Sequence, residues 1–155
     1  MSRRYGSLVS WVALSCLAMS AAEAEIVTQT LEGGFEEVSE SVRAAIVGKG
    51  INIAHVLESG DMLHRTGPAY GYEEDIYSQA LTYQFCSAKL SHQLARFNPE
   101  HIVLCPFTIA VYRVVGDEEG SVRVSYSIPE GSEGSESIST AIGELLQSII
   151  EDASW

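Results

Sequence analysis

The chain has 155 residues, of which 46% are hydrophobic and 19% are charged, and its formal net charge is −12 at pH 7. This length suits one domain with a hydrophobic core of its own. Such a strong negative charge repels nucleic acid and anionic lipid, so neither class of partner is expected. The charge would serve solubility and would attract basic partners.

The first 24 residues have the features of a secretory signal peptide. Arg3 and Arg4 precede an apolar run from Leu8 to Met19, and Ala22-Glu23-Ala24 fits the small-x-small rule for cleavage. The run is shorter than the ~20 apolar residues of a spanning helix. We therefore expect cleavage near Ala24, a single mature domain over residues 25–155, and a location in the periplasm or outside the cell.

The first half of the mature chain predicts two strands, one helix and a long loop. A strand over Ile26–Leu31 is followed by a helix that begins at Phe35 and ends near Gly48. In the second strand, Ile51, Ile53, His55 and Leu57 alternate with other residues and should share one apolar face. The polar segment Ser59–Ile76 contains three glycines and a proline, so we interpret it as a loop or flap.

The second half predicts three further strands and two helices. Ser87 is a candidate N-cap for a short helix with Leu90, Leu94 and Phe97 on its buried face. A flexible linker, Pro129–Ser135, precedes a strongly amphipathic final helix over Ile138–Ile150. The strands are expected at Leu81–Phe85, Phe107–Val115 and Ser121–Ile128. This order predicts an α+β fold of two layers, with a largely antiparallel sheet and helices packed on one face.

Cys86 and Cys105 are the candidate cysteine pair, because Cys16 lies inside the apolar run of the signal peptide. Export would place the protein in an oxidising compartment, where disulfides form and persist. A ten-residue helix between the two cysteines would instead carry the chain ~15 Å away at ~1.5 Å per residue, whereas a disulfide requires Cα atoms within ~7 Å. Three alternatives therefore stay open for Cys86 and Cys105: a disulfide, two buried thiols, or thiols that bind a ligand or take part in redox chemistry.

Histidine and methionine supply candidate ligands. His55 could ligate a metal or haem iron, or it could be a hydrogen-bonded core or interface residue. Met62 and His64 form a plausible copper or haem-iron pair by ligand softness, although a solvated loop explains them as well. His92 and His101 are expected at the surface.

Tyrosines in and near the flap are the remaining candidates for ligand binding. Tyr70 and Tyr72, with Tyr77, Tyr83 and Phe85, could close over an apolar pocket beneath the flap. They could equally anchor the flap to the core or to a second subunit.

No motif in the sequence indicates an enzyme. A nucleophile elbow, a P-loop, a dinucleotide fingerprint and a zinc-protease motif are all missing from it. We therefore expect a non-enzymatic, exported binding or accessory protein whose ligand is a small molecule, a metal or haem, or a partner protein. The alternative is a periplasmic redox protein that uses haem or copper bound by His and Met, or the thiols of Cys86 and Cys105. A homodimer packed through the final helix is a third hypothesis.

Four short motifs carry a family resemblance. They are Met62-Leu63-x-Arg65-Thr66-Gly67, Phe85-Cys86-Ser87-Ala88, Asn98-Pro99, and Cys105-Pro106-Phe107-x-Ile109-x-Val111-Tyr112. Together they resemble the Domain of Unknown Function 302 family over residues 35–129. The resemblance implies a compact α+β domain that is often dimeric, and it implies no established reaction and no catalytic residue.

Overall fold

The computed structural model describes residues 25–154. The predicted signal peptide, with Cys16, lies outside the described residues. None of the helices within residues 25–154 is both long enough and apolar enough to cross a lipid bilayer.

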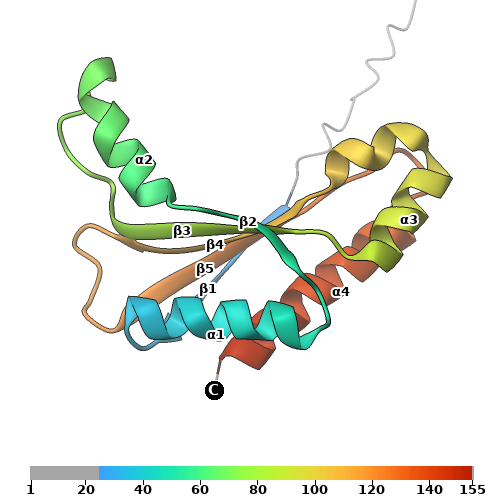
Figure 1. The fold of residues 1–155 in the computed structure, drawn as a ribbon, viewed down its shortest axis with the longest axis horizontal. Helices are drawn as coiled ribbons and strands as arrows, with labels where there is room; N and C mark the ends of the chain where they lie inside the picture. Colours follow the sequence, from blue (N-terminus) through green and yellow to red (C-terminus); the bar gives the residue numbers. More distant parts are fainter. Residues whose placement is uncertain (1–24, 155) are drawn as a thin grey trace, which may run out of the picture.

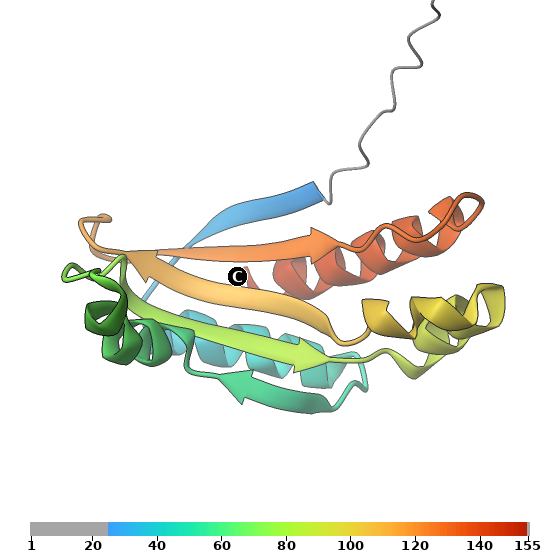
Figure 2. The same ribbon diagram turned by 90° about the horizontal axis from the view of Figure 1, so that it is seen from above.

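Five strands form one sheet in the order β1-β5-β4-β3-β2, and every neighbouring pair is antiparallel (Figure 2). The strands are β1 (Glu25–Glu32), β2 (Ile53–Leu57), β3 (Tyr77–Phe85), β4 (Phe107–Val114) and β5 (Ser121–Ile128). The predicted hairpin is confirmed, because β4 and β5 are paired neighbours. The first and last strands in the sequence, β1 and β5, also pair, and they do so over eight residues.

Two long helices, α1 (Phe35–Gly48) and α4 (Glu136–Ala153), cover one face of the sheet (Figure 1). The core lies between these helices and the sheet. Its fully buried side chains include Ile46 of α1, Phe85 of β3, Ile109 of β4, Val124 of β5 and Leu146 of α4. Full burial of a side chain of this size contributes about 1.5–3 kcal/mol. This layer confirms the predicted α+β class and its helices on one face.

The other face of the sheet has no helix across it and is called the uncovered face below. Near one end, α2 (Ser59–Thr66) and the short helix η1 (Gly67–Tyr70) form an arm that projects away on this side (Figure 1). At the other end, α3 (Ala88–Phe97) and η2 (Pro99–Leu104) extend past the strands as a cap. The sheet is therefore flanked by helical structure at both ends.

The arm corrects the expectation of a loop or flap over Ser59–Ile76. Most of this segment is helical, and Pro68 occupies the first turn of η1, where its missing N–H costs nothing. None of the residues of α2 or η1 is buried. The polar residues, the glycines and the proline of this segment indicated a loop, although they lie in two short helices. The arm also lies on the side of the sheet opposite α4 (Figure 1).

The register of β2 differs from the simple alternation predicted by the sequence. The pairing with β3 shifts between Ile53 and His55, so Ile53 pairs with Phe85 and faces the helices. His55 and Leu57 pair with Gln84 and Thr82 and project onto the uncovered face instead. A bulge reverses the side on which the following residues lie. The prediction that Ile53, His55 and Leu57 share one apolar face was wrong for this reason.

Candidate functional site

The uncovered face is built from every second residue of the five strands, because successive side chains of a strand point to opposite faces. Thr28 and Ser125, Arg123 and Tyr112, and Ala110 and Thr82 are cross-strand partners on this face. The full set is Ile26, Thr28, Thr30, Glu32, Ser121, Arg123, Ser125, Ser127, Thr108, Ala110, Tyr112, Val114, Tyr77, Ala80, Thr82, Gln84, His55 and Leu57.

A row of hydroxyl groups crosses this face. The Oγ1 atom of Thr28 lies 2.7 Å from the Oγ atom of Ser125, which lies 3.0 Å from the hydroxyl of Tyr112. The ring of Tyr112 also meets Tyr77 edge to face, with centroids 5.5 Å apart. These contacts join β1, β5, β4 and β3 side by side. They hold the aromatic rings and hydroxyls of the face in fixed positions.

Few charges lie on the uncovered face. Among its described side chains, Glu32 and Arg123 are the carboxylate and the guanidinium, and both lie toward the β4–β5 turn. Arg123 is paired there, with its Nη2 atom 2.6 Å from an Oδ1 atom of Asp117. The middle of the face is therefore uncharged, although the chain as a whole carries a net charge of −12.

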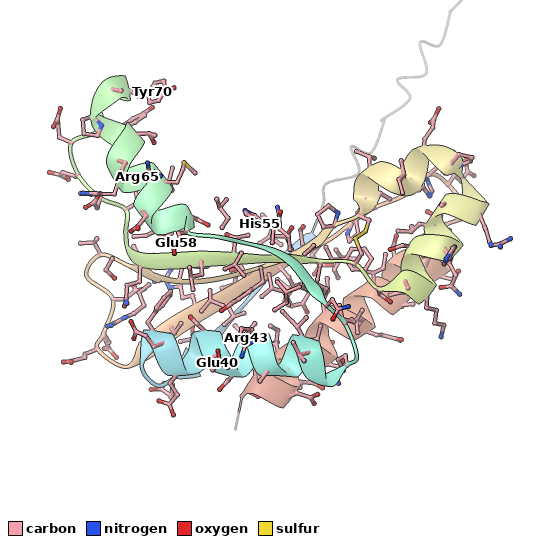
Figure 3. All side chains as sticks on the ribbon, in the orientation of Figure 1. Glu40, Arg43, His55, Glu58, Arg65 and Tyr70 are labelled. Carbon is pink, nitrogen blue, oxygen red and sulfur yellow. A yellow bond between two sulfur atoms is a disulfide. The ribbon has the colours of Figure 1, made fainter. Side chains whose placement is uncertain are left out.

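His55 lies on the uncovered face and is exposed (Figure 3). The alternative of a core histidine was wrong, because the bulge in β2 turns the side chain outward. Glu40 and Arg43 of α1 lie on the opposite side of the sheet and bond to each other (Figure 3). That pairing lowers the pKa of Glu40, chiefly through the hydrogen bond from Arg43. Both side chains are exposed, at 50% for Arg43 and 62% for Glu40.

The other four ligand candidates lie in the arm or directly after it. His64 is exposed, and its Nδ1 atom lies 2.9 Å from Asp75. Met62 is half-buried, and its backbone carbonyl accepts a hydrogen bond from Thr66. Tyr70 and Tyr72 are 77% and 73% exposed, so they neither anchor the arm to the core nor join Tyr83 and Phe85, which are buried.

Two hollows lie at the arm. One of about 290 Å³ is lined by Leu63, Tyr70, Tyr72 and Ile76. The second, of about 360 Å³, lies at the foot of the arm, and its lining includes Glu58, Asp61, His64 and Asp75. Within residues 25–154, no group of three or more His, Cys, Asp or Glu side chains is arranged to hold a metal ion. The ligand candidates of β2 and of the arm do not converge on one site.

Cys86 and Cys105 form a disulfide with their Cα atoms 6.0 Å apart. Cys86 follows β3 and Cys105 precedes β4, so the bond closes the cap formed by α3 and η2. The helix α3 does lead the chain away from Cys86, and η2 brings it back. The return of the chain over Pro99–Leu104 was not predicted from the sequence.

His101 corrects the expectation of a surface histidine, because it is only 6% exposed. Its Nε2 atom accepts a hydrogen bond from the backbone N–H of Ser132 at 3.0 Å. The ring stacks on Phe97 with centroids 5.7 Å apart. Ser135, at the start of α4, is also buried and donates to the carbonyl of Ser132. The segment predicted as a flexible linker is thus bound to the cap.

The exposed apolar residues of η2 were not predicted from the sequence. Ile102 and Val103 are 65% and 81% exposed, and Ile102 lines a groove beside the disulfide. The signal was present as the apolar run Ile102-Val103-Leu104, which lies between the predicted helix and the next strand. Ser91 was also overlooked; its Oγ atom lies 3.4 Å from the sulfur of Cys105.

Comparison with known proteins places these features in a family. A family model described as "Domain of unknown function DUF302" matches residues 27–153. The fold is similar to the crystal structure of an uncharacterized conserved protein DUF302 from Bacillus stearothermophilus, with a TM-score of 0.68 and 14% sequence identity. That similarity covers 83% of this chain and 97% of the other. No curated protein matches the chain. With nearly all of its described residues matched by the family model, this chain belongs to the DUF302 family.

Proposed function

We propose that this chain is a non-enzymatic, exported binding protein, and that the uncovered face of its sheet is a protein-binding surface. The partner that binds this face is a second copy of the chain, which makes the protein a homodimer. The observation that carries the proposal is a sheet face whose middle is uncharged, on a strongly acidic molecule. The basic start, the apolar run and the cleavage signal of residues 1–24 support export.

Charge distinguishes this face from the rest of the surface. Two copies of a chain with a net charge of −12 repel each other wherever their carboxylates approach. Across the middle of the uncovered face, Ala110, Thr82, Ser125 and Tyr112 can meet a second copy without burying an unpaired charge. Serine, threonine and tyrosine hydroxyls can also exchange hydrogen bonds across such an interface.

The size of the face fits a modest but specific interface. Strands lie about 4.8 Å apart and rise about 3.3 Å per residue, so five strands of this length present roughly 500–600 Å². Two such faces bury about 1,000–1,200 Å², near the lower limit of stable protein–protein interfaces. Contacts from the arm or the cap would add to this area. The arm projects on the same side of the sheet, where it can flank a bound molecule (Figure 1).

Light scattering of wild-type protein and of an Ala110→Lys variant tests the proposal. A two-fold axis places both introduced lysines in one interface, where like charges cost several kcal/mol. We expect a wild-type dimer and a dissociation constant at least about 100-fold weaker in Ala110→Lys. Gln93→Lys, on an exposed position of α3, adds the same charge elsewhere and should leave the dimer intact. A wild-type monomer at all concentrations, or a dimer unaffected by Ala110→Lys, contradicts the proposal.

A binding protein could instead hold haem or copper through His55, Met62 and His64. Nothing in the arrangement of these side chains favours that version over the protein-binding one. Titration with haem and with Cu(I) or Cu(II), followed by absorption spectroscopy, separates the two. Stoichiometric binding that is lost in His55→Ala or His64→Ala would favour the metal version.

A further inference from the structure

The sheet holds the two bonded cysteines together independently of their bond. Phe85 and Phe107, which lie beside Cys86 and Cys105 in the sequence, are register partners in β3 and β4. Both rings are buried and meet edge to face, with centroids 6.3 Å apart. Because this anchor is part of the core, opening the disulfide leaves the two sulfur atoms close to each other. Such a pair can be reduced and reoxidised without refolding.

The disulfide is accessible from outside. Cys86 is exposed and Cys105 is half-buried. Both line a groove of about 420 Å³ at the cap, together with Ser91, His92, Ile102 and two alanines of α3. In Figure 3 the yellow sulfur–sulfur bond lies at this end of the sheet. Accessible disulfides are the ones that exchange with thiols.

The lining of the groove suits an incoming thiolate. None of its described residues carries a carboxylate, although the chain contains 21 Asp and Glu residues. Thiolates are anions, so a groove free of negative charge avoids the repulsion that most of this surface would exert. The polar side chains at the rim are the hydroxyl of Ser91 and the imidazole of His92.

The two sulfur atoms are not equivalent. The hydroxyl of Ser91 lies 3.4 Å from the sulfur of Cys105 and donates a hydrogen bond to it. This donor stabilises negative charge on Cys105 once the disulfide opens, and so makes it the better leaving group. Cys86, the more exposed cysteine, is the one that an external thiolate reaches.

From these contacts we propose that Cys86–Cys105 is an exchangeable disulfide that oxidises a pair of cysteine thiols in a partner polypeptide. A partner thiolate attacks the sulfur of Cys86, the Cys86–Cys105 bond breaks, and Cys105 leaves as a thiolate hydrogen-bonded to Ser91. The second partner thiolate then attacks the partner sulfur of the mixed disulfide, and Cys86 leaves as a thiolate. The partner loses two electrons and gains a disulfide, and this chain gains two electrons and, on protonation, two thiols.

The surface beside the groove selects an apolar partner segment. Ile102 and Val103 of η2 are 65% and 81% exposed, and Phe97 of α3 is 46% exposed. Ile102 lines the groove itself, so its exposed apolar side chain provides contact area for a polypeptide beside the disulfide. A cysteine pair within an apolar stretch of another protein matches both the chemistry and the surface.

Reduction kinetics of the folded protein test the exchange. The protein, in a Cys16→Ser background, is mixed with either reduced glutathione or an apolar peptide containing two cysteines, and free thiols are followed over time. We expect a rate proportional to thiol concentration for both, a higher rate constant with the peptide, and an unchanged far-UV circular dichroism spectrum. A rate that is independent of thiol concentration would mean that the bond opens only when the protein unfolds, and would overturn the proposal.

Single substitutions test the assigned roles. In Cys105→Ser the free Cys86 should form a mixed disulfide with the oxidised peptide at least about tenfold faster than Cys105 does in Cys86→Ser, because the exposed sulfur reacts first. Ser91→Ala should slow reduction by about threefold to tenfold, the value of one hydrogen bond. Ser87→Ala, whose side chain makes no capping bond, is the matched control. Faster reaction at Cys105, or no effect of Ser91→Ala, contradicts the assigned mechanism.

The apolar contact is tested by Ile102→Gln, which removes an apolar side chain from the groove without adding a charge. This variant should lose the preference for the apolar peptide while its reaction with glutathione, a small thiol, changes little. Equal slowing with both thiols would show that Ile102 acts on the disulfide and not on the partner, which overturns the docking part of the proposal.

Discussion

The Nε2 atom of His101 lies 3.0 Å from both the backbone nitrogen and the Oγ atom of Ser132. The N–H of Ser132 is the donor and Nε2 is the acceptor. This contact joins the cap to the segment that leads from β5 into α4. The buried ring also stacks on Phe97, so one side chain fixes two parts of the chain.

His101→Ala should therefore lower the free energy of unfolding by about 2–3 kcal/mol, since it removes a buried side chain and leaves the N–H of Ser132 without its acceptor. Chemical denaturation measures the effect. His92→Ala, at an exposed position of α3, should change the stability by less than about 0.5 kcal/mol. Equal effects of the two substitutions would contradict the role given to His101.

The raised pKa of Tyr83 should make the protein less stable at alkaline pH. Burial, and then the negative charge of Glu40, raise the pKa of Tyr83 above its ordinary value of 10.0. The neutral phenol therefore stabilises the fold below pH 10, and this stability is lost as the pH rises through the folded-state pKa. Unfolding free energies measured across this range should fall with pH in wild type.

Tyr83→Phe should remove part of that alkaline slope. At neutral pH the variant should be less stable by about 1 kcal/mol, because the hydroxyl of Tyr83 donates to the carbonyl of Ser39 at 2.9 Å. Tyr70→Phe, which changes an exposed ring, should follow the wild-type curve. A Tyr83→Phe curve with the wild-type slope would show that other groups cause the alkaline loss.

The close approach of Gly60 to β3 limits the size of the side chain that this position of α2 can accept. A Cβ atom at this position would lie 2.9 Å from the backbone nitrogen of Ala80 in β3. Gly60→Ala must push α2 away from the sheet, and we expect a loss of about 1–3 kcal/mol. Gly48→Ala meets nothing within 4 Å and should stabilise α1 by up to about 1 kcal/mol. Thermal unfolding of both variants gives the comparison, and a stabilised Gly60→Ala would contradict the close packing of the arm.

Asp117 holds the turn between β4 and β5. Its two carboxylate oxygens accept hydrogen bonds from Arg123 at 2.6 Å and from the backbone N–H of Val114 at 3.0 Å. Asp117→Ala should cost about 1–2 kcal/mol, because it removes both bonds. Glu119→Ala removes an exposed carboxylate from the same turn and should be nearly neutral. Denaturation that shows the reverse order would contradict this role.

The sequence predicted the parts of the fold that bury an apolar face. Helices α1 and α4 and strands β1, β4 and β5 have clear periods of 3.6 or 2 residues because one side of each meets the core. The arm has no buried residue, and its short, mostly polar helices resemble a loop in composition. In β2, the bulge between Ile53 and His55 changes the side on which residues lie without a glycine or proline to mark it.

The candidate sites were harder to predict, since they depend on how distant segments meet. The disulfide required the return of the chain through η2, which a single helix length cannot indicate. His101 is buried by contacts with residues 132–135, and nothing local to Asn98-Pro99-Glu100 shows it. The neutrality of the uncovered face became visible only when the strand register assigned each residue to a side.

The pairing of β1 with β5 has a consequence for the order of folding. Residues 25–32 pair only with residues 121–128, so the first strand to be synthesised cannot pair until the last strand has been made. Pairings between such distant segments are slow to form because a long loop has to close first. The sheet cannot be completed until residues 121–128 have been synthesised, so β1 waits longer for its partner than any other strand of the sheet does.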